Sequence, residues 1–278
     1  MATALDRTAR TAVRAPLQFA VKTGEIPVAL VSAPGSGPDR SSGTFEWRDV
    51  DILDGRPIAA GLDLDRHGFL LREEPTAVKD FYDEVEVRNV YYPEMAALVQ
   101  RLTGAEKVVV FDHTIRLDDP ESQAARKTRA PVKNVHNDFT VNSAPQRVRD
   151  LLGPEEAAMR LGRRYGSINV WRPIRGPVET APLAICGWDS LAESDLIASE
   201  RRYQDRIGGV YQLAHNPAQR WYYFPRMARE EVVILKCFDS RADGTARWTA
   251  HGSFKDPTSA PGAAPRESIE IRTMYFFA

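Results

Sequence analysis

The chain has little cysteine, almost no net charge and no long apolar run. Only two of its 278 residues are cysteines, Cys186 and Cys237, and both lie in apolar segments. Such a pair is typical of buried free thiols rather than of a disulfide or a cysteine metal site. The formal net charge is −1, so we expect neither nucleic acid nor an anionic membrane as a partner.

The missing apolar runs also restrict the location of the protein. No uninterrupted apolar stretch is long enough to span a membrane, and residues 1–14 are polar, without the apolar centre of a signal peptide. We therefore expect a cytoplasmic protein. A hydrophobic content of 43% is near the ordinary globular range, and 278 residues can bury a substantial core. There is no internal repeat and no clear second domain.

The pattern along the chain predicts a mainly β fold with flanking helices. A strand rich in β-branched residues covers 107–115, and apolar residues at helical spacing predict helices over 75–82 and 94–102. Two further helices are expected over 143–152 and 154–162. Beyond them come short strands separated by turn signals: 167–172, 183–186, 210–215, 221–224, 231–238, 247–252 and 268–277.

This order favours a double-stranded β-helix, the cupin-like jelly roll, as the core. We expect a single domain over residues 1–278. In it, residues 1–105 supply strands and helices that pack on the core. Residues 106–278 form the jelly roll, with a helical insertion at about 143–163.

The segment Val135-His136-Asn137-Asp138-Phe139-Thr140 holds the most informative residue pair. Alternate residues of an extended chain face the same side, so His136 and Asp138 would point into one cavity while Asn137 turns away. Two histidines and one carboxylate form an iron site with positions left open for cosubstrate and dioxygen. His251 is the best candidate for the third ligand. The rival pair Asp112-His113 is adjacent within a strand, so its side chains point to opposite faces.

Fifteen residues after His251 comes Arg266-x-Ser268, again an i, i+2 pair. The set His136-x-Asp138, His251 and Arg266-x-Ser268 resembles the iron(II)/2-oxoglutarate-dependent oxygenase superfamily. Further segments occur in the same order as in one of its branches. They are VHNDFT, SINVWRPIRGPVETAPLAICGWDSL, YYFPRMAREEVVILKCFDS, AHGSF and PRESIEIR. Over roughly the last two thirds, the chain is similar to the gibberellin-desaturase-like and cephamycin-methoxylase-like hydroxylase/desaturase family of bacteria and fungi.

This resemblance implies a non-haem iron(II)/2-oxoglutarate-dependent dioxygenase acting on a small molecule, in specialised metabolism. It implies iron(II) as cofactor, 2-oxoglutarate and O2 as cosubstrates, an Fe(IV)=O species as oxidant, and succinate and CO2 as products. Hydroxylation and desaturation use the same oxidant and are not distinguished. The resemblance also implies that Arg266 and Ser268 hold the far carboxylate of 2-oxoglutarate.

Other residues compete for these roles. Arg272 shares a strand face with Arg266 and is either a second carboxylate contact or a partner of Glu270. Arg172 and Tyr211 are further candidates for 2-oxoglutarate binding. We expect substrate contacts from Arg116, which ends the strand over 107–115. Asn169 and Trp171 are also candidates, because they share alternate register, although core packing is an equal reading for Trp171.

Two other functions stay open at this stage. A 2-oxoglutarate-independent non-haem iron oxidase would keep the metal and use Arg266 for a substrate carboxylate. A non-catalytic partner subunit of a two-component system would keep only the fold, and the intact ligand set argues against it. A homodimer is also left open.

Overall fold

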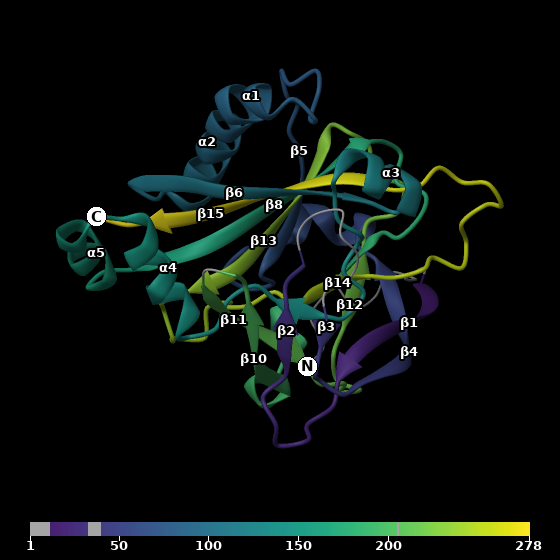
Figure 1. The fold of residues 1–278 in the computed structure, drawn as a ribbon, viewed down its shortest axis with the longest axis horizontal. Helices are drawn as coiled ribbons and strands as arrows, with labels where there is room; N and C mark the ends of the chain where they lie inside the picture. The colour runs from purple at the N-terminus through teal and green to yellow at the C-terminus, as the bar shows by residue number, and fades with distance from the viewer. Residues whose placement is uncertain (1–11, 33–39, 205) are drawn as a thin grey trace.

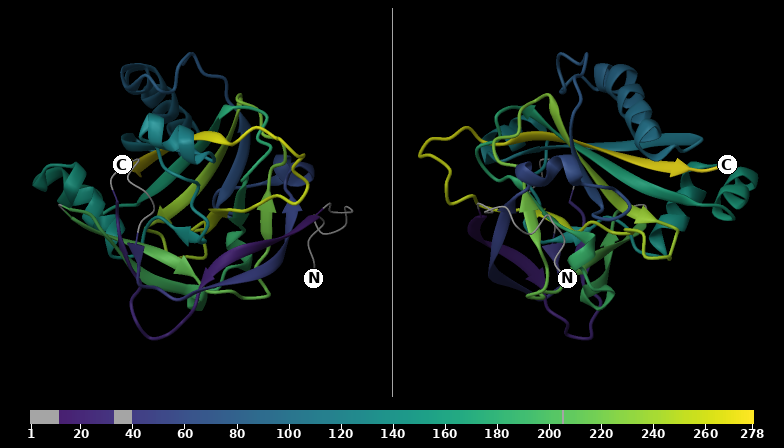
Figure 2. Two further views of the ribbon diagram at one scale, coloured as in Figure 1. Left: turned by 45° about the vertical axis from the view of Figure 1, so that its right-hand side comes forward. Right: turned by 180° about the vertical axis from the view of Figure 1, so that it is seen from behind.

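A computed structural model describes residues 12–32, 40–204 and 206–278. Within these ranges the strands form two sheets that face each other across a common interior (Figure 2). The prediction of a mainly β fold with a jelly-roll core is confirmed. In the described residues, no helix is long and apolar enough to cross a membrane. Most of the polar N-terminal segment, residues 1–11, lies outside the described residues.

The smaller sheet has five strands, and each pairs antiparallel with its neighbours. In sheet order they are β5 (Phe69–Glu73), β13 (Glu231–Asp239), β8 (Tyr165–Arg175), β15 (Glu267–Phe276) and β6 (Lys107–Leu117). Residues opposite each other in an antiparallel pair project to the same face. Arg116, Ser268 and Pro173 therefore form one row. Thr114, Glu270 and Trp171 form the next, followed by Asp112, Arg272 and Asn169.

The larger sheet has ten strands. In sheet order they are β1 (Ala12–Ala20), β4 (Phe45–Asp54), β12 (Trp221–Tyr223), β9 (Leu183–Cys186), β14 (His251–Ser253), β7 (His136–Asn137), β11 (Ile207–Leu213), β10 (Leu196–Arg202), β2 (Val28–Leu30) and β3 (Arg40–Ser41). The short central strands β14 and β7 are the ones that carry the predicted metal ligands. The strands of the N-terminal third extend both ends of this sheet, and β5 adds an edge to the smaller one.

Helices cover the outside of the smaller sheet (Figure 1). α1 (Glu84–Glu86), the π-helical turn η3 (Val87–Tyr91) and α2 (Tyr92–Thr103) follow one another directly, and Gly104 ends α2 at φ 70°. The remaining helices are α3 (Pro120–Arg126), α4 (Ser143–Leu151), α5 (Pro154–Leu161) and the 3-10 turns η2 (Arg56–Gly61), η4 (Trp188–Ser190) and η5 (Glu193–Asp195). The helical insertion thus lies where the sequence predicts it.

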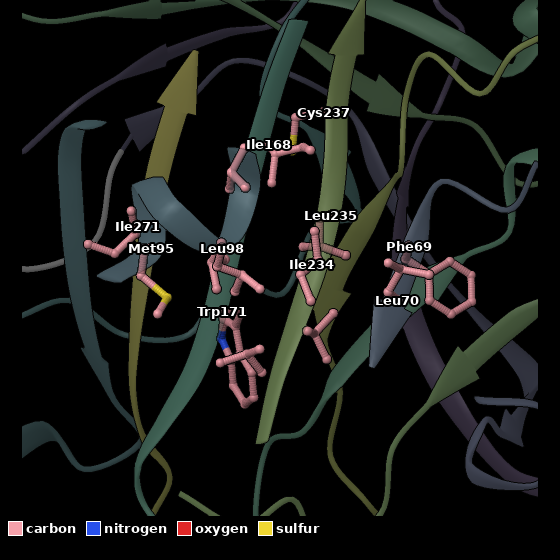
Figure 3. Packing of buried hydrophobic residues seen from close by; sticks show 14 of the residues in the cluster. Phe69, Leu70, Met95, Leu98, Ile168, Trp171, Ile234, Leu235, Cys237 and Ile271 are labelled. Atoms are coloured by element: carbon pink, nitrogen blue, oxygen red, sulfur yellow. The ribbon is translucent and has the colours of Figure 1, made fainter. Parts of the chain in front are cut away.

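Part of the main core lies between α2 and the outer face of the smaller sheet, and the same cluster includes Ile185 and Tyr222 of the larger sheet. Met95 and Leu98 of α2 pack over Ile271 and its neighbours, and the cluster continues to Phe69 at the sheet edge (Figure 3). Because both faces of β8 are covered, ten of its eleven residues are buried. This packing fixes the inner face of the sheet, from which polar side chains project into the interior.

One predicted helix is wrong, and of the predicted strand over 247–252 only residues 251 and 252 lie in a strand, β14. Residues 75–82 form no helix, because backbone N–H groups there donate to the carboxylates of Glu94 and Glu86 instead of to a helical carbonyl. Val78 and Phe81 of this loop are nevertheless buried, which explains the misleading apolar spacing. Strand β10 was not predicted.

Candidate metal centre and cosubstrate pocket

Two central strands of the larger sheet bring the predicted ligands together. His251 of β14 lies directly opposite His136 of β7, and their ring centroids are 4.8 Å apart. One donor atom from each of His136, Asp138 and His251 lies within 4.8 Å of the others. Residues more than a hundred positions apart in the chain therefore meet at one point.

The backbone fixes the orientation of both imidazole rings. His136 Nδ1 is 2.9 Å from the carbonyl oxygen of Asn134, and His251 Nδ1 is 2.8 Å from that of Thr249. A carbonyl oxygen accepts only, so each Nδ1 carries the hydrogen and each Nε2 keeps its lone pair. Burial lowers the pKa of His251, with repulsion from His136 as the second cause. The neutral ring that results is the form that binds a metal.

The carboxylate of Asp138 is held from both sides. Its Oδ1 lies 3.4 Å from His136 Nε2, while its Oδ2 accepts hydrogen bonds from Asn169 Nδ2 at 2.7 Å and from Arg272 Nε at 3.0 Å. Burial alone would raise the pKa of Asp138, but Arg272 and then His136 outweigh it and hold this pKa well below its usual value. Asp138 is therefore ionised, as a metal ligand must be.

Alternation along the strands has the predicted effect. Asn137 turns away from the ligand cluster and donates to the carbonyl oxygen of Cys237, while its own oxygen accepts from Thr249 N. The rival pair also points apart. Asp112 lies 3.4 Å from Arg272, whereas His113 packs against Tyr92 on the helical side.

Arg272 is engaged with carboxylates of the protein itself. Besides Asp138, its guanidinium lies 3.3 Å from Glu270 Oε2. Glu270 also accepts from Asn169 at 2.9 Å and lies 3.9 Å from His251 Nε2. Of the two readings of Arg272, the structure favours the partner of Glu270. Glu270 itself was not predicted as a site residue, although it shares a strand face with Ser268 and Arg272.

Arg266 has a different environment, a buried one without a counter-ion. It is 3% exposed, stacks over the ring of Trp171 at 5.4 Å and donates from Nη1 to the carbonyl oxygen of Ala181 at 2.6 Å. Among the described residues, no carboxylate lies within ion-pair distance of it, and neither its Nε nor Ser268 Oγ has a hydrogen-bond partner. Burial lowers the pKa of Arg266 to about 9, with repulsion from Arg116 as the second cause. An entering carboxylate would satisfy both groups.

The structure does not bring Arg172 to this site, and its contacts argue against the prediction that it binds 2-oxoglutarate. Because Asn169 and Trp171 face the interior, Arg172 projects from the opposite face of β8. There it donates from Nε to the hydroxyl of Tyr91 at 2.9 Å and from Nη1 to a backbone carbonyl oxygen at 2.6 Å. These contacts satisfy a fully buried guanidinium without any cosubstrate.

Tyr211 lies beside the loop that follows Asp138. Its hydroxyl is the acceptor for Val141 N at 3.5 Å, and its ring packs edge-on against Trp248 at 5.5 Å. It pairs with Asn137, the residue that turns away from the ligand cluster. This placement suits support of the loop after Asp138 better than contact with 2-oxoglutarate.

Comparisons with known proteins identify the family. A family model described as "Oxidoreductase/YMDC permease-like domain" matches residues 17–276. The Fe(II)/2-oxoglutarate-dependent dioxygenase nvfI of Aspergillus novofumigatus is 34% identical over 248 residues, which cover 86% of this chain and 87% of that protein. The chain belongs to the iron(II)/2-oxoglutarate-dependent dioxygenases.

Two further comparisons show similarity over most of the chain. The hydroxylase/desaturase efuI of Hormonema carpetanum is 33% identical over 84% of this chain and 85% of that protein. A solved structure of the iron and alpha-ketoglutarate-dependent endoperoxidase NvfI superposes with a TM-score of 0.85 at 30% identity. The match covers 96% of this chain and 99% of that chain.

The protein is therefore an enzyme that uses iron(II), 2-oxoglutarate and dioxygen on small-molecule substrates. The two alternatives, a 2-oxoglutarate-independent oxidase and a non-catalytic subunit, are set aside. The side chains present fit these groups. Two neutral imidazoles and one carboxylate suit iron(II) with open positions. A buried arginine and a buried hydroxyl, both with unsatisfied atoms, suit the anionic far end of the cosubstrate.

Proposed function

We propose that His136, Asp138 and His251 are the iron ligands of this dioxygenase. The observation that carries the proposal is the convergence of their three donor atoms within 4.8 Å in a buried site. The backbone carbonyls behind both rings, together with Arg272 and Asn169 behind Asp138, support it further. Such outer partners orient ligands and strengthen metal binding.

We further propose that Arg266 and Ser268 hold the far carboxylate of 2-oxoglutarate. Arg266 is the better candidate than Arg272, because Arg272 already pairs with Asp138 and Glu270. Trp171 lies against the Arg266 guanidinium and limits its movement. A guanidinium that is already desolvated and held by stacking loses little freedom when it binds a carboxylate.

In this mechanism the chain binds, orients and shields. When bound, iron(II), 2-oxoglutarate and dioxygen supply the oxidising chemistry, and the cosubstrate leaves as succinate and carbon dioxide. The two histidines and Asp138 fix the metal at the inner wall of the interior. Arg266 and Ser268 would hold one end of the cosubstrate through its far carboxylate. The surrounding sheet residues exclude bulk water from the site.

For the reaction, we propose hydroxylation or desaturation of a specialised metabolite. The names of several relatives support this class: hydroxylase/desaturase efuI, hydroxylase/desaturase CTB9 of Cercospora beticola, and endoperoxidase NvfI. The different activities in these names accord with one oxidising centre whose outcome depends on how the substrate lies beside it. A cytoplasmic location and a homodimer stay predictions, and sedimentation of the purified protein measures the second.

The test is anaerobic mixing of the iron(II) protein with 2-oxoglutarate. We expect the weak visible charge-transfer band of the chelate in the wild type and in Arg172→Gln, whose guanidinium faces the other side of β8. In Arg266→Gln the band should need a much higher 2-oxoglutarate concentration. A wild-type protein that holds iron but gives no band would contradict the assigned site, as would equal titrations of Arg266→Gln and Arg172→Gln.

A further inference from the structure

A large cavity opens onto the proposed metal ligands. Its volume is about 610 Å³, within the range of small-molecule sites, and His136 and Asp138 form part of its wall. The remaining wall comes from β6, the loop after α3, α4 and the start of β11. A molecule in this cavity would lie beside the ligand cluster, so the cavity is the natural place for the substrate.

The cavity is strongly cationic although the whole chain has a net charge of −1. Among the described residues that line it are nine arginine or lysine side chains and four carboxylates. All four of those carboxylates have partners. Arg272 pairs with Asp138 and Asp112, and Arg88 pairs with Glu84 at 2.6 Å. Asp150 accepts from Gln146 at 2.8 Å and lies 3.9 Å from Arg147. Among the described lining residues, basic side chains thus outnumber acidic ones around the space that the substrate would occupy.

Arg116 is a lining cation with no carboxylate partner among the described residues. It projects from β6 on the face it shares with Ser268, and it is partly buried. It donates from Nη1 to the carbonyl oxygen of Ala130 at 2.8 Å, and no carboxylate of the described residues lies within 4.0 Å of it. Burial lowers the pKa of Arg116 to about 10. A desolvated guanidinium with free N–H donors is costly unless an anion meets it.

Arg147 of α4 adds a second cation on another wall. Its guanidinium lies 5.2 Å from the centre of the Phe111 ring, and its distance to Asp150 is 3.9 Å, at the limit of an ion pair. Burial lowers the pKa of Arg147, with repulsion from Arg206 as the second cause. Aromatic rings share the same cavity. They belong to Phe81, Tyr82, Phe111, Phe139 and Tyr203.

We propose that the substrate is a carboxylic acid with an apolar or aromatic body, and that its carboxylate pairs with Arg116. The aromatic walls cover the apolar body, and Arg147 adds attraction at longer range. This inference rests on the proposed function, since it needs the cavity to open onto the iron ligands. It goes further by naming the chemical class of the substrate. Because Arg116 neighbours Ser268, the competing role is a second contact to 2-oxoglutarate.

The experiment uses the full-length iron(II) protein under argon, with N-oxalylglycine as an inert mimic of the cosubstrate. Calorimetry compares 2-naphthoic acid with 2-naphthamide, which differ in charge but hardly in shape. We expect the acid to bind at least about 10-fold more tightly than the amide, as for a close charge pair in a partly desolvated site. Arg116→Gln should remove this difference, and Arg147→Gln should reduce it by a factor of about 2 to 5.

Arg88→Gln is the matched control, because Arg88 lines the same cavity but already pairs with Glu84. Both probes should bind this variant as they bind the wild type. Equal affinity of acid and amide for the wild type, or no binding of either, overturns the proposal. So does an Arg116→Gln variant that loses N-oxalylglycine affinity, because Arg116 would then serve the cosubstrate.

The two proposals fail separately in this design. N-oxalylglycine binding to the wild type tests the assigned cosubstrate site, whereas the preference for acid over amide tests the substrate class. If Arg116→Gln does not fold, the wild-type preference and its reduction in Arg147→Gln still decide the outcome.

Discussion

Arg272 and Asp138 form an ion pair that joins the two sheets at the metal site. The Nε atom of Arg272, on β15 of the smaller sheet, lies 3.0 Å from Oδ2 of Asp138, which follows β7 of the larger sheet. Because Oδ2 also accepts from Asn169, the carboxylate cannot rotate freely, and Oδ1 remains directed toward His136. The pair thus selects which oxygen faces the metal position.

Replacing Arg272 by glutamine should weaken iron binding. The variant frees Oδ2 of Asp138 and leaves Glu270 without its cation, so we expect iron(II) affinity to fall about 10- to 100-fold, as for other outer partners of metal ligands. Anaerobic calorimetry measures this. Arg175→Gln on the neighbouring strand, with a 65% exposed side chain, is the control and should bind iron as the wild type does. Equal affinities of the two variants would contradict the role of the pair.

Removing either imidazole ligand should abolish stoichiometric iron binding. His136→Ala and His251→Ala each leave two protein ligands of the three that this site type requires. Elemental analysis of the purified proteins gives the metal content. His215→Gln is the control, because His215 packs edge-on against Phe19 at 5.1 Å and is not part of the ligand cluster. Full iron content in His136→Ala would count against the ligand assignment.

Arg266 and Ser268 should contribute unequally to the free energy of 2-oxoglutarate binding. Arg266→Gln removes the cation from a desolvated pair and should cost about 2–5 kcal/mol of 2-oxoglutarate binding, roughly 30-fold to several thousand-fold in Kd. Ser268→Ala removes one neutral donor and should cost about 1 kcal/mol, or roughly 5-fold. Titration of the iron(II) protein measures both. Iron affinity without cosubstrate should stay unchanged in each variant, and its loss would indicate a general structural defect instead.

Arg172→Gln should lower the stability of the fold and leave 2-oxoglutarate binding unchanged, the reverse of what we expect for Arg266→Gln. The variant leaves the hydroxyl of Tyr91 and two partly buried carbonyl oxygens without their donor, and we expect a loss of about 3 kcal/mol in the free energy of unfolding. Denaturant titration measures this. The Kd for 2-oxoglutarate should remain within about twofold of the wild type. A large rise in that Kd with unchanged stability would restore Arg172 as a cosubstrate ligand.

Alternation within single strands could be predicted from the sequence, and it accounts for much of the site. The i, i+2 spacing of His136 and Asp138 correctly places both on one side with Asn137 turned away. The same rule, applied to Asn169 and Trp171, already excludes Arg172 from their face. The candidate role of Arg172 in cosubstrate binding conflicts with this local constraint.

Pairing between strands could not be predicted in the same way. Nothing near His251 in the sequence indicates that it lies opposite His136, because that register depends on how β9, β14 and β7 assemble. The pairing of Arg116 with Ser268 likewise depends on the register between β6 and β15. The cationic cavity arises in the same manner, from arginines that are scattered along the chain and converge only in the folded protein.

The register of His136 against His251 also bears on how the protein matures. The ribosome must add more than a hundred residues after Asp138 before it reaches His251, so until then a growing chain carries only two of the three ligands. The complete ligand set can therefore form only after His251 has been added and β14 has docked beside β7. A metal ion bound to residues of both strands would then add its binding free energy to the stability of the closed sheet.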